Sequence, residues 1–314
     1  MSSSPQTVNQ APSARTHVGT IPIGYIYALI AILSGSIAAV LAKRGISASI
    51  GPIPLLSVRL VIGAALLWLA QWFVFRQRPQ IDRQLLFGAI AAGVANSISL
   101  SCFYLALLTI NASVAMFVFS AHPLIVMGLL AVLGQALTQR DIVRSLIALV
   151  GVGLLVGVGG QVAWQGVALV MVTNVLYSIH LVIVQRYLKP YAPAQVTPIL
   201  ITVMAVCVTA VYLLTSPPLE WLVFPPDGWI IILLTAVFST AVARLALIAE
   251  IQHLGSGQTA LFGPVETLLS VAWAVIFLGE QLTPIQILGG TLVLFSAILI
   301  VRFRPRLPSD PSAT

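Results

Sequence analysis

The sequence predicts an all-α polytopic membrane protein with ten transmembrane helices. The first observation is composition: of 314 residues, 59% are apolar and 7% are charged, and the mean hydropathy is +1.04. A water-soluble protein of this size would carry about 25% charged residues to hydrate its surface. The second is that apolar residues gather in runs of about 20, enough to cross ~30 Å of hydrocarbon. Most of the surface is therefore expected to face lipid.

The apolar runs are separated by short polar or Pro/Gly segments, which set the boundaries of the predicted elements. Residues 1–20 are rich in Ser, Pro, Gln and Thr and lack the apolar core of a signal peptide, so a disordered tail is expected there. The predicted spans are 22–42, 54–75, 84–108, 112–134, 142–158, 164–186, 195–215, 228–251, 258–278 and 285–302. Their continuous apolar character favours helices over the alternating strands of a membrane barrel.

The net charge of +7 is explained by topology. The cations stand in ones, twos and threes between apolar runs, so no basic face could follow a nucleic acid. With the N-terminus inside, eleven cations fall in inside segments, including Arg76, Arg78 and Arg83, whereas outside segments hold only Lys43 and Arg44. Lys- and Arg-rich short loops stay cytoplasmic. We therefore expect both termini in the cytoplasm, in a bacterial-type inner (plasma) membrane.

The sequence predicts no metal, no cofactor and no enzymatic activity. Cys102 and Cys207 lie in separate apolar runs without a CxxC partner. The glycine-rich run at 151–160 has Val where a dinucleotide loop needs glycine, and helix packing explains it better. No GxxxxGK motif for ATP is present, and the Ser256 and His253 pair lacks the third group of a hydrolase.

Three short segments recur in the same order and indicate an internal repeat. LSGSIAAVLAKR (33–44) parallels LYSIHLVIVQR (176–186), LTINASVAMF (108–117) parallels QHLGSGQTALF (252–262), and LGQALT (133–138) parallels LGEQLT (278–283). The predicted domains are thus two five-helix repeats, 21–160 and 161–304, followed by a cytoplasmic tail at 305–314. Because five is odd, equivalent helices cross in opposite directions. Such inverted repeats are typical of transporters with a site at the membrane midplane.

The chain resembles EamA-type members of the drug/metabolite transporter (DMT) superfamily. The resemblance covers residues 22 to 304 and is carried by LLSVRLVIGAALLWL (55–69), ASVAMFVFSAHPLIVMGLLAVLG (112–134) and GPVETLLSVAWAVIFLGEQLT (263–283). It implies a ten-helix exporter or exchanger of small metabolites, commonly amino acids or related compounds, with cytoplasmic termini and a cavity between the halves. The first repeat has Gln135 where the family usually has the Glu kept here as Glu280.

Polar residues at membrane depth are costly in hydrocarbon and usually face a cavity or a partner, so they are the candidate site. The candidate cavity residues are Asn96, Tyr104, His122, Asn174, Tyr177, His180, Arg244, Glu266 and Trp273, and Arg59 is placed in the outer vestibule. They lead us to expect a cavity lined by the first, third, fourth, sixth, eighth and ninth spans.

Several of these residues have two interpretations. Arg244 and Glu266 lie at similar depth, so they can form a structural salt bridge or bind substrate or protons. Arg59 can extend to the headgroups or contact a carboxylate or phosphate. His122 and His180 can be packing residues or proton relays.

We therefore predict a secondary carrier that exports or exchanges a small metabolite by alternating access. Its expected partners are the small-molecule substrate and the lipid bilayer. The alternative is a non-transporting membrane subunit, or a lipid-flipping or assembly partner, which would have a packed, dry centre. The sequence is compatible with proton coupling and with either a monomer or a homodimer.

Overall fold

The computed structural model describes residues 23–48, 50–75, 81–132, 163–215 and 224–302, and single residues between 139 and 154. Throughout these ranges the regular elements are helices, and they contain no strand. The predicted all-α class is confirmed. The predicted fifth span at 142–158 and the LGQALT segment at 133–138 lie almost entirely outside the described residues.

The first half supplies four spans within the described ranges. Its elements are α1 (Ile23–Ser36), α2 (Ala38–Ser47), α3 (Pro52–Ala70) with the π-helical turn η1 (Gln71–Phe75), α4 (Arg83–Ala106), α5 (Ala112–Phe119) and α6 (His122–Val132). Helices α1 and α2 form one span, as do α5 and α6. The first span runs to Ser47, five residues beyond the predicted end at 42. The predicted span ends before the charged residues Lys43 and Arg44. In the structure the Lys43 ammonium is hydrogen-bonded to the backbone carbonyls of Leu107 and Ile110, so its charge is accommodated and the helix can continue past it.

The second half follows the same order. Its elements are α8 (Trp164–Ile183) with η2 (Val184–Leu188), α9 (Pro193–Thr215), α10 (Pro226–Leu234), η4 (Thr235–Val242), α11 (Ala243–Leu254), α12 (Ser256–Leu278) and α13 (Pro284–Arg302). Helices α10, η4 and α11 make one span. In the described chain, seven helices are long and apolar enough to cross a membrane, and Val265–Leu278 and Pro284–Phe295 are shorter apolar helices.

Local sequence sets where these helices begin and end. Asp82 caps α4 by accepting a hydrogen bond from the Leu85 backbone N–H at 2.7 Å. Pro52 and Pro226 stand in the first turns of α3 and α10, where a missing N–H costs nothing. Gly279, with φ +64°, ends α12 in the left-handed conformation that glycine adopts without strain.

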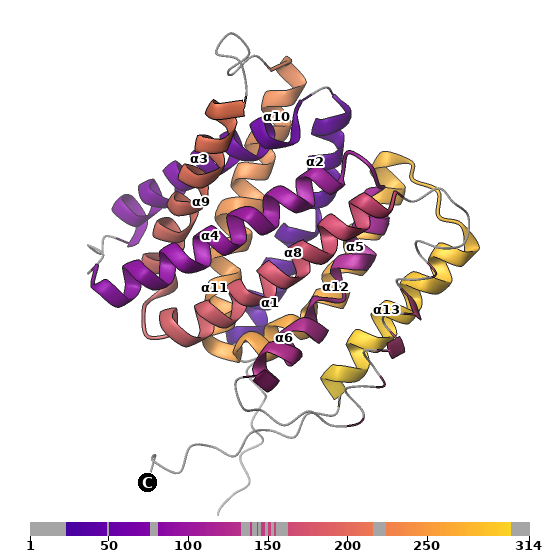
Figure 1. Cartoon of the computed structure of the whole chain (residues 1–314). Helices are drawn as coiled ribbons and strands as arrows, with labels where there is room; N and C mark the ends of the chain where they lie inside the picture. Colours follow the sequence, from indigo (N-terminus) through magenta and orange to yellow (C-terminus); the bar gives the residue numbers. More distant parts are fainter. Residues whose placement is uncertain are drawn as a thin grey trace, which may run out of the picture.

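The two halves pack against each other in a matched pattern (Figure 1). The repeat makes α1 equivalent to α8, α4 to α11, and α3 to α9. The α1–α11 contact is then the counterpart of the α4–α8 contact, and α3 packs on its own counterpart α9. Close approach depends on small residues. A Cβ added to Gly93 on α4 would lie 2.8 Å from the Val203 Cγ1 atom of α9.

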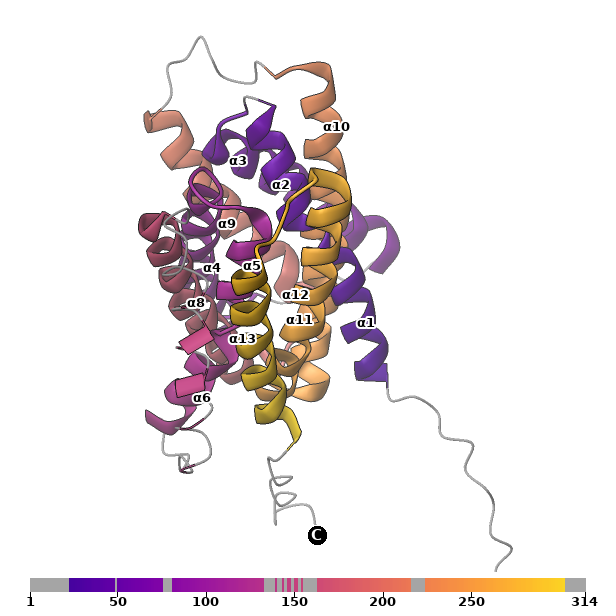
Figure 2. The same ribbon diagram turned by 90° about the vertical axis from the view of Figure 1, so that its right-hand side faces the viewer.

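The two ends of the bundle can be named by their polar residues. Helix α1 begins and α13 finishes at the same end (Figure 2). The start of α1 lies against Leu254 at the end of α11, whose Gln252 contacts Tyr191, and Tyr191 contacts Asp82, so we call this end the Asp82 end. The opposite end holds the α4–α5 connection, the start of α10 and Glu280, and we call it the Glu280 end. The described chain thus enters and leaves the bundle on one side.

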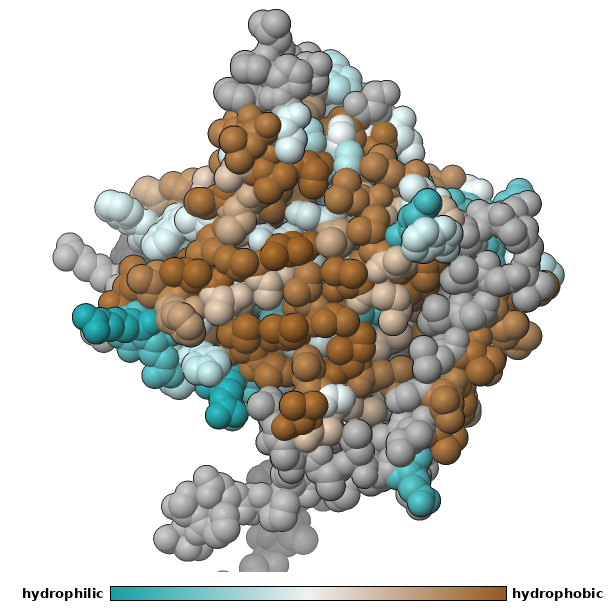
Figure 3. Space-filling model, viewed as in Figure 1, coloured by the Kyte–Doolittle hydropathy of each residue, from teal (hydrophilic) through white to brown (hydrophobic). Residues whose placement is uncertain are grey.

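The lateral surface is apolar. Large side chains such as Trp72 and Leu214 are 79% and 87% exposed, and Figure 3 shows a broad hydrophobic face over the helices. Exposed apolar area on this scale would be unstable in water, but hydrocarbon accommodates it. The surface is that of an integral membrane protein.

Candidate functional site

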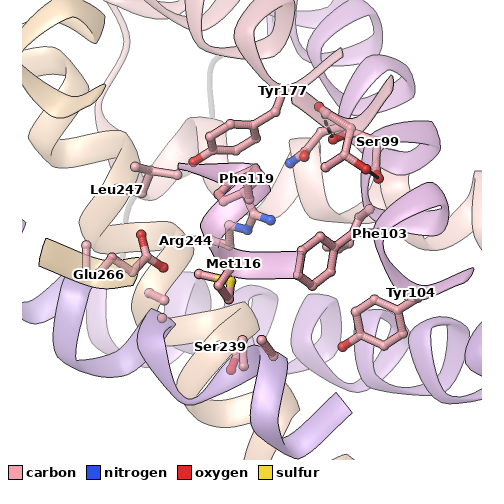
Figure 4. Close-up of a pocket in the computed structure, with 18 of the residues that line it drawn as sticks. Ser99, Phe103, Tyr104, Met116, Phe119, Tyr177, Ser239, Arg244, Leu247 and Glu266 are labelled. Carbon is pink, nitrogen blue, oxygen red and sulfur yellow. Dashed lines mark hydrogen bonds between the residues drawn. The ribbon is translucent and has the colours of Figure 1, made fainter. Parts of the chain in front are cut away.

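A cavity of about 120 Å³ lies inside the bundle between the two halves (Figure 4). Its wall is formed by α1, α2, α3, α4, α5, α8, η4, α11 and α12. These elements belong to the six spans predicted to line a cavity, with the second span added through Arg59. The polar lining residues are Arg59, Asn96, Ser99, Tyr104, Thr173, Tyr177, Ser239, Arg244 and Glu266.

Arg59 is part of this wall and does not lie at the mouth of an outer vestibule. The residue is 3% exposed, and its guanidinium carbon is 4.9 Å from the centroid of the Tyr104 ring. A cation over an aromatic face is attracted by the ring's quadrupole, and this attraction holds the side chain inward instead of toward the headgroups. Its Nε and Nη1 atoms have no hydrogen-bond partner in the described structure. Arg59 therefore presents unsatisfied donors inside the protein.

Arg244 and Glu266 line the same cavity from α11 and α12 (Figure 4). Among the described residues there is no ion pair between them within 4.0 Å, so the direct salt bridge is absent from this structure. The Glu266 carboxylate lies instead against Gly35 of α1, where an added Cβ would be 2.6 Å from Oε1.

Aromatic side chains form the apolar part of the wall. Phe103, Tyr104, Phe119 and Tyr177 line the cavity together with Met116. Phe103 and Phe119 pack edge to face, with ring centroids 5.9 Å apart, and Phe119 lies 5.2 Å from Tyr177. The site thus combines two cations, one acid and several aromatic faces. Such a mixture can hold a ligand that has charged groups and an apolar body.

Three candidate residues line neither this cavity nor the smaller one described below. Asn174 donates to the Val118 carbonyl at 2.8 Å, and a ring nitrogen of His180 lies 3.1 Å from the Ala92 carbonyl. The Trp273 indole donates to the Ser36 hydroxyl at 3.1 Å. Each of the three contacts a neighbouring helix, so these polar groups join helices.

His122 belongs to a second, smaller cavity of about 30 Å³ on the side of Glu266 nearer the Asp82 end. One of its ring nitrogens lies 3.0 Å from the Phe119 carbonyl, and the ring packs on Phe119 and Tyr177. The two cavities share wall residues, including Tyr177 and Glu266. Glu266 therefore faces both.

Some lining residues were not predicted. Ser99 and Thr173 each donate to the other's backbone carbonyl at 3.0 Å, and Ser239 contributes a hydroxyl, but short hydroxyl side chains are common in such helices and gave no distinctive signal. Glu250 lines the smaller cavity and is 2% exposed. The predicted eighth span ends at 251, one residue after Glu250, whereas α11 continues to Leu254. Glu250 therefore lies within the helix and is buried. A predicted span that ended at 254 would have included Glu250 among the polar residues at membrane depth.

A helical bundle embedded in lipid, built from two matched halves around an internal cavity that contains charged and polar side chains, has the architecture of a transporter. The sequence matches the EamA-like transporter family over residues 22–157 and again over residues 164–302. The chain belongs to this family of membrane transporters of the DMT type. The family's members are transporters and not enzymes.

Comparison with solved structures also finds this fold. A solved structure named "Crystal structure of protein" is similar with a TM-score of 0.64 at 18% sequence identity, over 90% of this chain and 97% of that chain. At this identity the likeness shows the fold alone. No curated protein matches this chain.

Proposed function

We propose that the protein is a secondary carrier for an amino acid or a related small metabolite, which it exports or exchanges by alternating access. The observation that carries the proposal is the charge arrangement in the larger cavity. Arg59 and Arg244 are available to a carboxylate, because neither forms an ion pair with an acid among the described residues. Glu266 is available to an ammonium group.

The size of the cavity supports a small ligand. A volume of about 120 Å³ has room for roughly ten waters, at about 10–15 Å³ for each. That space accommodates an amino acid whose side chain packs between Phe103, Tyr104 and Phe119. Guanidinium groups bind carboxylates through paired hydrogen bonds, which gives specificity as well as affinity.

The proposed orientation places the Asp82 end in the cytoplasm. The cations Arg83, Arg186 and Lys189 lie at that end, and Lys43 lies at the other. In this orientation the larger cavity is reached from either side in turn, when the halves rock against each other. A central cavity with charged and polar lining residues is also what distinguishes a carrier from a scaffold with a packed centre.

The test is binding and exchange of labelled amino acids by the purified protein in proteoliposomes. Arg244→Gln should weaken binding of the transported amino acid at least tenfold, because a charged hydrogen bond contributes about 1.5–3 kcal/mol. The same variant should leave binding of the matching amino amide, which lacks the carboxylate, within twofold of wild type.

The matched control is Arg44→Gln, since Arg44 is exposed on α2 and lies outside the cavity. It should bind and exchange like wild type. The proposal is wrong if no amino acid or related compound exchanges, or if Arg244→Gln weakens the amino acid and its amide equally. Absence of exchange by a folded protein would favour the non-transporting subunit.

A further inference from the structure

The smaller cavity contains two carboxyl groups from different helices. Glu250 of α11 and Glu266 of α12 both line it, and its volume of about 30 Å³ has room for two or three waters, at about 10–15 Å³ for each. No Lys or Arg of the described chain lines this cavity, and Arg244 faces only the larger one. The two carboxyl groups therefore face the same cavity, and no Lys or Arg of the described chain lies on its wall.

Incompletely paired polar atoms point to something that binds in this cavity. Glu250 is 2% exposed and Thr259 is 6% exposed, and both line the cavity. The Glu250 Oε1 and Thr259 Oγ1 atoms form no hydrogen bond of standard geometry in the described structure, although the Thr259 hydroxyl is near enough to the Glu250 carboxyl to interact with it. Buried polar atoms are nearly always paired, so these two neighbouring, incompletely paired groups on one small cavity indicate that a proton, water or ion binds there.

The other groups around Glu250 do not supply a permanent positive charge. Helix α6 contributes His122, which is directed to the Phe119 carbonyl through one nitrogen, and α8 contributes the Tyr177 phenol. Helix α1 contributes only the apolar Ala31 and Ile32. The elements α9 and η2, which also pack on α11, place no described ionisable group on this cavity.

Two neighbouring carboxylates in a small buried cavity repel each other, and such a pair retains a proton. Glu266 also faces Arg244 across the larger cavity, which favours its charged form. Glu250 has no such partner. The proton of the pair is therefore expected on Glu250.

We propose that Glu250 is a proton-binding residue separate from the substrate site and coupled to it through Glu266. In the empty carrier Glu250 is protonated, because Glu266 carries the charge. When the ammonium group of a substrate neutralises Glu266, the repulsion on Glu250 falls and its O–H bond releases the proton to water. One proton leaves for each substrate that binds, which gives proton–substrate antiport.

The protonated state of Glu250 can be tested without any substrate. Infrared spectra of the protein in lipid at pH 7 should contain the C=O stretch of a protonated carboxylic acid. The band should be absent from Glu250→Gln and retained in Glu250→Asp, which keeps an acid at the same place. Asp227→Asn is the matched control, because Asp227 is an exposed acid in the first turn of α10 and its loss should leave the band unchanged. A wild-type spectrum without the band, or a band that persists in Glu250→Gln, overturns the proposal.

The coupling step rests on the proposed carrier function and is tested separately. In proteoliposomes a pH gradient should increase substrate accumulation by wild type severalfold. Glu250→Gln should keep exchange of labelled for unlabelled substrate at near wild-type rate but lose the stimulation by the gradient. Stimulation that survives in Glu250→Gln refutes the coupling. If wild type exchanges no substrate, the proposed function and the coupling are both wrong. The infrared spectra then still show, independently of transport, whether Glu250 is protonated.

Discussion

The two ends of the bundle hold equivalent helix starts in different ways. Helix α5 begins at the Glu280 end and its counterpart α12 begins at the Asp82 end. Each helix start exposes backbone N–H groups that have no partner within the helix. At the Glu280 end these groups are bound by a carboxylate from the other half, whereas at the Asp82 end they are bound by an amide from the same half.

The Glu280 end relies on charged groups that are partly buried. Glu280 accepts from the backbone N–H of Ala112 at 2.8 Å and of Ser113 at 2.9 Å. Lys43 donates to the carbonyls of Leu107 and Ile110 at 2.6 and 2.9 Å, just before the same helix. An anion is favoured at a helix N-terminus and a cation at exposed carbonyls, so both contacts follow the helix dipole.

The Asp82 end relies on neutral or exposed contacts. The Gln185 side-chain oxygen accepts from the Ser256 backbone N–H at 2.9 Å and from its hydroxyl. Gln252 donates to the Tyr191 carbonyl at 2.6 Å. The hydrogen bonds between the halves at this end are exposed: the Tyr191 hydroxyl donates to Asp82, at 2.6 Å to Oδ2, and the Gln84 side chain donates to the Tyr187 carbonyl at 3.3 Å. The halves are therefore expected to separate at lower cost at the Asp82 end.

The largest expected effect is the loss of the Glu280 carboxylate. Glu280→Ala removes two charge-assisted hydrogen bonds and leaves two backbone donors of α5 unsatisfied, at a cost of about 2–4 kcal/mol. Thermal unfolding in detergent should show the loss, and Glu280→Gln, which keeps one acceptor oxygen, should recover part of it. A loss below about 0.5 kcal/mol, the size of an ordinary surface change, would remove the difference between the two ends.

The next effect is the loss of the Lys43 ammonium. Lys43→Met should cost about 1–2 kcal/mol, because two carbonyls lose a charged donor but remain partly accessible to water. Arg44→Met is the matched control on the adjacent, exposed residue and should change stability by less than about 0.5 kcal/mol. Combining Lys43→Met with Glu280→Ala should give less than the sum of the single effects, since both groups hold the start of α5. Strict additivity would contradict a shared role.

A smaller effect is expected at the Asp82 end. Gln185→Ala removes a neutral acceptor from the start of α12 and should cost about 0.5–1.5 kcal/mol in the same unfolding measurement. The comparison of ends requires this loss to be smaller than that of Glu280→Ala. An equal or larger loss would mean that the amide holds α12 as firmly as the carboxylate holds α5.

The smallest effect is confined to acid conditions. The Tyr191 hydroxyl and the Leu85 backbone N–H lower the pKa of Asp82 below its ordinary value of 3.8. A lowered pKa contributes stability that is present above the unfolded value and is lost as the pH falls through the folded value. The difference in unfolding temperature between wild type and Asp82→Asn should therefore be constant above about pH 5 and shrink below about pH 4.

The control for this pH effect is Asp227→Asn. Its difference in unfolding temperature from wild type should not shrink between pH 5 and pH 4 in the way expected for Asp82→Asn. A pH-independent difference for Asp82→Asn would show that the Tyr191 contact does not favour the charged carboxylate. On the same principle, the hydrogen bond and charge of Asp82 raise the pKa of the Tyr191 phenol above its ordinary value of 10.0. Its contribution is lost only in strongly alkaline solution.

The sequence by itself determined the helices, their approximate limits and the approximate depth of most polar side chains within them. Lipid allows few spanning structures, because every backbone group must be hydrogen-bonded within the protein, so an apolar run of sufficient length has to be a helix. Depth follows from residue number at about 1.5 Å per residue. For this reason Asn96, Tyr104, Tyr177, Arg244 and Glu266 could be predicted from residue number as candidate cavity residues, and these five line the larger cavity.

Only the tertiary structure decided which way each of those side chains faces and what it meets. Successive residues turn by about 100° around a helix axis, so depth leaves open whether a group meets a cavity, a neighbouring helix or lipid. Packing directed Arg59 inward over Tyr104, and it engaged Asn174, His180 and Trp273 with neighbouring helices. It also enclosed Glu250 beside Glu266, because α11 extends past the predicted end of its span. These outcomes depend on contacts between segments far apart in the chain, and spacing along one helix does not encode them.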